Sequence, residues 1–167
     1  MSDMTMTAEI AGAITEDTMS GKFLTFRVAD GEYGIGIAYV TDIIKLQGIT
    51  PVPHMPVYIR GVTNLRGTIA PIIDMRLRFG CEEGSYNERT CIIILSLDDM
   101  SIGVIVDEVR EVADIGEGDI QPPPKATGSA VKNNFVGAIG NFEGRVTQML
   151  DIDKVFDTAA ESLGNGQ

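Results

Sequence analysis

The sequence predicts an all-β fold in which short strands close into a small barrel or sandwich. Short apolar segments of strand-like composition recur along most of the chain, and turn-forming residues separate them. Convincing helical patterns are few, which disfavours helical architectures. Glycine is abundant, with 19 residues among 167. Many glycines fall inside strand patterns, where bulges and bends let a small sheet close on itself; they are Gly34, Gly36, Gly103, Gly137 and Gly140.

The first ordered element is expected to be a hairpin that begins near Lys22. Residues 23–28 have a strand pattern, Asp30 and Gly31 form a turn signal, and residues 33–37 return as the partner strand. Residues 1–20 are rich in Thr, Ala and Met and show no strong period. We therefore expect this segment to be a flexible arm.

The segment after the first hairpin has a helical spacing of apolar residues. This spacing over residues 38–44 predicts one or two helical turns that end before Gly48. Prolines 51, 53 and 56 then indicate an irregular connection. The residues that produce the spacing are Tyr39, Val40, Ile43 and Ile44.

A second hairpin is predicted around a tight turn. The apolar residues before the turn are Val57, Ile59 and Val62, and those after it are Ile69, Ile72 and Ile73. Asn64 and Gly67 are turn formers, because Asn tolerates a left-handed backbone and Gly adopts positive φ without steric cost. A hairpin tip at this point presents Arg66 to solvent, and a solvated turn arginine is the simplest interpretation of that residue.

The middle of the chain contains a candidate helix and a third hairpin. Residues 74–80 begin with Asp and end with Gly, as a short helix does, although their apolar positions alternate and leave extended structure open. Residues 91–97 form a continuous apolar run, which is typical of a strand covered on both faces. Residues 101–106 would pair with that strand and place Ile102, Val104 and Val106 on one face.

The C-terminal third begins with a connector and ends with two apolar segments. Residues 121–134 hold three consecutive prolines and few apolar side chains, so we expect a long excursion there. Residues 135–139 and 146–156 are apolar, with a turn over residues 141–144. One ordered domain over residues 21–157, with a C-terminal tail at 158–167, is the organisation we expect.

Composition excludes several functional classes. A hydrophobic content of 44% is incompatible with a disordered chain, and a net charge of −11 disfavours binding to nucleic acid or anionic lipid. No run approaches the roughly 18 consecutive apolar residues of a membrane-spanning helix, and residues 1–7 lack the basic start of a signal peptide. A cytosolic location with reduced thiols at Cys81 and Cys91 is therefore expected.

The sequence shows no catalytic or metal-binding pattern. His54 is the sole histidine and lies among prolines, so it is interpreted as a solvated loop residue. Acidic pairs at 98–99, 107–108 and at 151 with 153 lack the spacing of a calcium-binding loop. No nucleophile elbow or phosphate-binding loop is present. We expect a binding module without enzymatic activity, cofactor or metal.

Six sequence segments resemble the CheW family and occur in the family's order. They are residues 23–26, 32–35, 40–43, 60–74, 103–109 and 151–155, and the segment at 60–74 carries the most distinctive pattern. The resemblance covers residues 22–156. It implies a fold of two small five-stranded SH3-like barrels packed side by side around a shared apolar core, with one or two short helices.

The resemblance also implies a function. Members of this family are non-enzymatic adaptors that couple the helical tips of chemoreceptors to the regulatory domain of the histidine kinase CheA, in the cytoplasm and at membrane receptor arrays, where ring assembly with the kinase is possible. The matching receptor-binding positions are Ile37, Val40, Arg66, Val106 and Val112. The matching kinase-binding positions are Asp42, Val52, Arg60, Gly61 and Gln121.

Alternatives remain open at this point. Core packing explains Val40, Val106 and Val112 as well as binding does, because buried valine is common in barrels. Thr147 and Gln148 interrupt the last apolar strand, and Gly36 replaces a larger polar residue; both are departures from the family pattern. An adaptor of another chemosensory pathway, such as pilus motility, and a ligand-binding barrel are the alternative functions.

Overall fold

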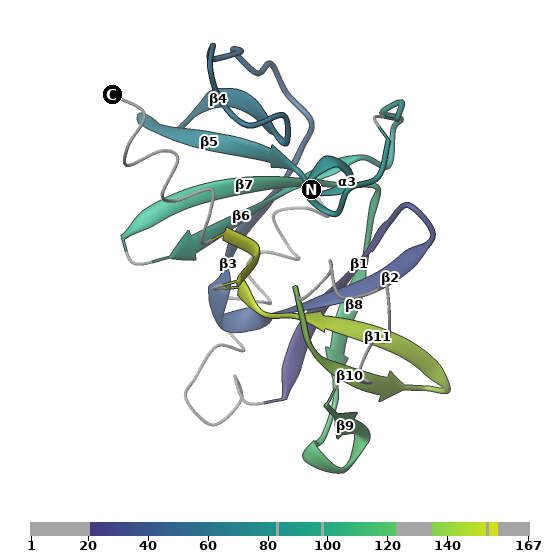
Figure 1. Ribbon diagram of the computed structural model, residues 1–167. Coiled ribbons are helices and arrows are strands. Elements are labelled where there is room, and N and C mark those ends of the chain that lie inside the picture. Colours follow the sequence, from purple (N-terminus) through teal and green to yellow (C-terminus); the bar gives the residue numbers. More distant parts are fainter. Residues whose placement is uncertain (1–20, 83, 98, 123–134, 153, 157–167) are drawn as a thin grey trace.

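Two β-sheets, each curled into a small barrel, pack against each other (Figure 1). The computed structural model describes residues 21–82, 84–97, 99–122, 135–152 and 154–156. The predicted arm at 1–20, most of the excursion at 121–134 and the tail at 158–167 lie outside these residues. In chain order the elements are β1 (Lys22–Val28), β2 (Gly31–Gly36), η1 (Ile37–Tyr39), β3 (Val40–Lys45), β4 (Ile59–Leu65), β5 (Thr68–Asp74), α3 (Met75–Arg78), β6 (Cys91–Leu97), β7 (Met100–Val106), β8 (Glu108–Asp114), η2 (Glu117–Asp119), β9 (Ile120–Gln121), β10 (Val136–Phe142) and β11 (Arg145–Leu150).

The first sheet has the order β8-β1-β2-β11-β10-β9 and the second has the order β3-β6-β7-β5-β4. The all-β prediction with two barrels is confirmed, and the first sheet adds the two-residue strand β9 to the five expected. Among the described strands most neighbours are antiparallel, and β2 with β11 and β5 with β7 are the parallel pairs. The three predicted hairpins are present as β1–β2, β4–β5 and β6–β7.

One element differs from its prediction. Residues 38–44 were expected to be helical, but only the single turn η1 forms, and β3 follows it at once. β3 pairs with the buried strand β6 over residues that include Ile43 and Ile44. These β-branched side chains fit a pleated surface better than a helix, so tertiary pairing outweighs the helical spacing. For residues 74–80 the helical alternative is confirmed: α3 begins after Asp74, whose carboxylate accepts a hydrogen bond from the Arg76 amide at 2.9 Å.

Buried side chains form three clusters, and the largest lies between the sheets. This shared core takes one face of each sheet, with Leu24 and Phe26 from β1 and Ile73, Val104 and Val106 from β5 and β7. A smaller cluster around Ile72, Ile92, Ile94 and Ile105 fills the second barrel. Another, around Ala113, Ile115 and Met149, fills the first. Each sheet is therefore apolar on both faces along its central strands.

Polar contacts also join the two sheets where the chain crosses between them. Asp107, between β7 and β8, accepts hydrogen bonds from the Arg76 side chain at 2.9 Å and from the Ala29 amide at 2.8 Å. The hydrogen bond to Asp107 raises the pKa of Arg76, so its guanidinium stays charged at neutral pH. Arg78 lies over the rings of Tyr58 and Phe135 and donates to the Val155 carbonyl at 2.7 Å, which ties the last residues described to the junction.

Gly61 is required where the second barrel closes. Thr50 and Val62 exchange two backbone hydrogen bonds of 2.8 and 2.9 Å across this closure. Gly61 has a φ of 145°, and a Cβ placed there would lie 2.1 Å from the Thr50 carbonyl oxygen. A side chain at this position would therefore collide with rigid backbone.

We predict that Gly61→Ala lowers the free energy of unfolding by about 2–5 kcal/mol, because it combines an unfavourable φ with backbone overlap. Urea unfolding followed by circular dichroism would measure this. Gly48→Ala is the matched control, because nothing lies within 4 Å of a Cβ at Gly48. The control should change stability by less than about 1 kcal/mol. Equal effects of the two substitutions would contradict the closure argument.

Candidate functional site

The β4–β5 hairpin presents Arg66 to solvent, as the turn pattern predicts. The loop between the strands contains two residues, Arg66 and Gly67, with φ values of 54° and 88°. Both positive values are typical of the tight turns that suit the twist of a hairpin. Asn64 fixes the loop by accepting the Gly67 amide with its side-chain oxygen at 2.8 Å. The Arg66 side chain is 85% exposed.

Arg66 is held by Asp42 from the other edge of the second sheet. The guanidinium donates to the Asp42 carboxylate at 2.6 Å. Asp42 follows a bulge in β3, where Thr41 is an extra residue between two pairings with β6. The second carboxylate oxygen of Asp42 accepts a hydrogen bond from the Ile43 amide. The pair borders a groove of ≈ 290 Å³. The groove is lined by Thr41, Asp42, Ile44, Gln47, Asn64, Leu65, Arg66, Ile94 and Ser101, which we call the Arg66 groove.

A second groove of ≈ 490 Å³ lies beside β4. Arg60 is the extra residue of a bulge in β4, which turns its side chain toward this groove. Val52 and Val57, which are 37% and 73% exposed, lie on its wall. The complete lining, which we call the Arg60 groove, is Leu46, Gln47, Ile49, Pro51, Val52, Val57, Ile59, Arg60 and Tyr86.

Tyr86 connects the Arg60 groove to the interior. Its hydroxyl donates to the Asp74 carboxylate at 2.6 Å, and Asp74 is 1% exposed. The same carboxylate caps α3 through the Arg76 amide. Asp74 thus has polar partners for both oxygens despite its burial, as a buried carboxylate requires.

The remaining predicted site residues are dispersed. Ile37, Val40 and Val106 lie in the shared core with exposures of 3%, 4% and 0%. Val112 is 40% exposed on β8, in the first sheet. Gln121 lies in β9 at the far edge of that sheet (Figure 1).

The structure therefore regroups the two predicted sets. Asp42, expected on the kinase side, pairs with Arg66, expected on the receptor side. Val52 and Arg60 share one groove, and Gly61 closes the barrel beside it. Sequence reasoning missed Val57 and Tyr86 as site residues. The place of Val57 directly after Pro56 was a signal for it, whereas no sequence pattern pointed to Tyr86.

In the part of the chain that the structure describes, no group of three or more His, Cys, Asp or Glu residues is arranged to hold a metal ion. No helix in the described part of the chain is long and apolar enough to cross a membrane. Cys81 is exposed, and the Cys91 thiol donates to the Arg89 carbonyl at 3.2 Å. Burial raises the pKa of Tyr33, so its hydroxyl stays protonated at neutral pH.

Comparison with known proteins gives a consistent family. A model of the CheW-like domain matches residues 22–160. The chain belongs to the CheW family. It is 32% identical to the chemotaxis protein CheW of Klebsiella aerogenes over 163 residues, covering 98% of this chain and 95% of that protein. The crystal structure of the scaffolding protein TtCheW from Thermoanaerobacter tengcongensis matches with a TM-score of 0.74 and 34% identity, covering 82% of this chain and 92% of that one.

A further relative has another name. Protein FrzA of Myxococcus xanthus is 29% identical over 143 residues, covering 84% of this chain and 88% of FrzA. The chemotaxis relatives and the scaffolding structure agree in family and in near-complete length. The protein is accordingly a chemotaxis adaptor of the CheW family.

The Asp42–Arg66 pair is expected to add little to stability, because the arginine is exposed and hydrated. A double-mutant cycle with Asp42→Ala and Arg66→Ala should give a coupling energy of about 0.2–1 kcal/mol in the free protein. Urea unfolding of the four proteins would measure it. A coupling above about 2 kcal/mol would mean that the pair is structural, and binding losses in either variant would then reflect unfolding.

Proposed function

We propose that this adaptor couples the helical tip of a chemoreceptor to the regulatory domain of a CheA kinase, in the cytoplasm at receptor arrays. The observation that carries the proposal is the exposed Arg66, held by Asp42 at the border of a groove. Family membership supplies the class of partner. The two grooves, which meet at Gln47, give an adaptor two adjacent contact surfaces.

The receptor surface is proposed to include the Arg66 groove. The tip of a helical hairpin exposes backbone carbonyls that have lost their helical partners, together with side-chain carboxylates. A guanidinium has several donors in fixed geometry and binds such oxygens well. Ile44, Leu65 and Ile94 supply apolar surface in the same groove for the sides of the helices. Asp42 keeps Arg66 oriented before the partner arrives.

The kinase surface is proposed to include the Arg60 groove. Its exposed apolar wall, Val52 and Val57, is the kind of surface that a partner buries. Arg60 adds a charge within that apolar setting. Because the kinase domain has a fold similar to this family, a barrel-to-barrel contact at this end of the second sheet is the arrangement we propose.

The buried and remote positions receive indirect roles. Ile37, Val40 and Val106 pack in the shared core, so we assign them support of the receptor surface rather than direct contact. Val112 keeps a direct role, since it is exposed. Gln121 lies on the other sheet from the Arg60 groove, and a kinase contact there would be a separate patch.

The similarity to FrzA favours a second candidate, an adaptor with the same coupling role in another chemosensory pathway. Both candidates use the same two surfaces. They are distinguished by which receptor and kinase from the same organism bind the protein. Kinase activity that changes only when receptor, adaptor and kinase are combined would support either one.

Arg66→Glu is predicted to weaken receptor binding by about tenfold or more, because a reversed charge would face the oxygens of the tip. Calorimetry with a soluble receptor signalling fragment would measure this. Arg89→Glu is the control, since Arg89 is also exposed but lies in the turn before β6. Unchanged affinity in the Arg66 variant, or an equal loss in the control, would remove Arg66 from the receptor surface.

Val57→Asp is predicted to weaken binding to the kinase regulatory domain by about tenfold or more, because it places a charge in an apolar contact. Receptor affinity should change less than about twofold. Val146→Asp is the control, because Val146 is 64% exposed on β11 of the other sheet. Equal losses in the two variants would argue against a kinase contact at the Arg60 groove.

A further inference from the structure

The pairing of β1 with β8 contains an irregularity next to Val112. Leu24 lies opposite Val112 and Phe26 lies opposite Val109. One residue, Thr25, separates the two positions on β1, but two residues, Arg110 and Glu111, separate them on β8. β8 therefore carries a β-bulge at Arg110 and Glu111.

The bulge decides which face of the first sheet each β8 residue occupies. Val109 packs against the shared core, whereas Ala113 lies in the core of the first barrel. In a regular strand, residues four positions apart point to the same face. Val109 and Ala113 point to opposite faces because the extra residue of the bulge lies between them. Val112 consequently lies opposite Leu24, on the sheet face that packs against the shared core. It nevertheless remains 40% exposed to solvent.

The hydroxyl of Thr25 occupies the gap in the ladder. It donates to the Glu111 carbonyl at 2.8 Å and accepts from the Glu111 amide at 3.1 Å. Thr25 is 2% exposed, so water cannot readily replace it. The hydroxyl thereby satisfies both backbone groups of a bulged residue, which would otherwise be costly to bury.

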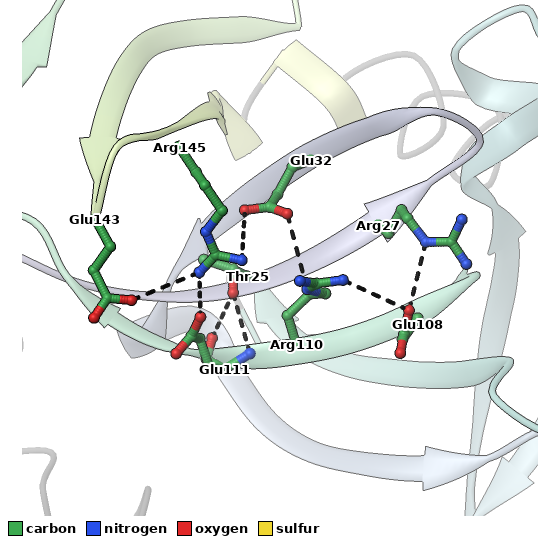
Figure 2. Close-up of polar contacts among 8 residues, drawn as sticks. All are labelled: Thr25, Arg27, Glu32, Glu108, Arg110, Glu111, Glu143 and Arg145. Atoms are coloured by element: carbon green, nitrogen blue, oxygen red, sulfur yellow. Dashed lines mark hydrogen bonds and ion pairs between the residues drawn. The ribbon is translucent and has the colours of Figure 1, made fainter.

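The two bulged side chains also reach charged partners on β2 and β11, beyond the adjacent strand β1 (Figure 2). Glu111 pairs with Arg145 of β11, and Arg110 pairs with Glu32 of β2 at 3.8 Å. Arg145 also approaches Glu32 at 3.8 Å, so Glu32 links Arg110 to Arg145, the partner of Glu111. The acidic partners of Arg145 raise its pKa, and the hydrogen bond with Glu111 is the largest cause. These ion pairs are partly exposed and screened by salt, which leaves the buried hydroxyl as the stronger restraint.

We propose that Thr25 is a positioning residue: its hydroxyl locks the bulge of β8, and the bulge fixes the direction in which Val112 faces the receptor. This inference rests on the receptor-binding role proposed above for Val112. Valine at position 25 would preserve shape and strand preference but leave the Glu111 amide and carbonyl without this partner.

The test compares the full-length wild type with Thr25→Val and Thr25→Ser. In Thr25→Val the Glu111 amide should exchange with deuterium at least about tenfold faster, because local opening then no longer requires breaking its hydrogen bond to the Thr25 hydroxyl. Affinity for the receptor signalling fragment should fall about fivefold to tenfold, while affinity for the kinase domain should stay within about twofold. Thr25→Ser, which keeps the hydroxyl, should restore both values to near wild type.

Thr90→Val is the matched control. Thr90 is 4% exposed and its hydroxyl accepts the Asn87 amide at 2.9 Å, so this change also removes a buried threonine hydroxyl, but next to β6 of the other barrel. It should leave receptor affinity within about twofold of wild type. If Thr25→Val fails to fold, protection of the Glu111 amide in the wild type still tests the lock. Exchange there as fast as in solvent-exposed amides would overturn it.

The other outcomes are distinct. A wild type that binds the receptor fragment, with Thr25→Val binding equally well, would overturn the inference and leave the proposed function standing. Equal losses of receptor and kinase affinity in Thr25→Val would show general destabilisation and also overturn it. A wild type that does not bind the receptor fragment would reject the proposed function and this inference with it.

Discussion

The apolar layer shared by the two sheets is the constraint on which the rest of the structure depends. Each barrel has only a few buried side chains of its own, around Ile92 in one and Ile115 in the other, whereas the shared core gathers most of the large ones. A barrel of this size buries too little surface alone to offset the loss of chain entropy. We therefore expect the two barrels to fold and unfold as one cooperative unit. Their relative position is fixed by packing, and by Asp107 where the chain crosses between them.

This constraint separates residues that form a surface from residues that support it. Ile37 and Val40 stand where the chain passes from β2 through η1 to β3, from one sheet to the other, and both are buried in the shared core. Enlarging or removing such side chains would disturb the junction, and binding would weaken without any lost contact. Residues beside bulges are different. Asp42 and Arg60 are partly buried and Val112 is exposed, and each of the three lies in or next to a bulge. A bulge redirects a side chain while the core beneath stays packed.

Local signals explain how much the sequence could predict. The hairpin at Arg66 was predictable, because Asn64 and Gly67 fix the turn from within a few residues. β3 was mistaken for helix, because its spacing fits a helix and only pairing with β6 reveals a strand. The sequence pattern does not reveal β8 as a strand, because its bulge breaks the alternation between Val109 and Val112. The pairing of Asp42 with Arg66 depends on how the second barrel closes, and no local pattern encodes that closure.

A rigid junction also suits an adaptor. The two grooves lie on the second sheet, and Val112 lies on the first, so a partner that touches both sheets contacts elements held together by the shared core, its polar contacts and the chain crossings. A hinge there would let each contact form independently, and binding at one surface would not bias the other. Stacked rings from Phe26 through Tyr33 to Phe79, and Arg78 over the Tyr58 ring, fill this junction. Dense packing of this kind resists deformation, which would hold constant the spacing between the two grooves and Val112.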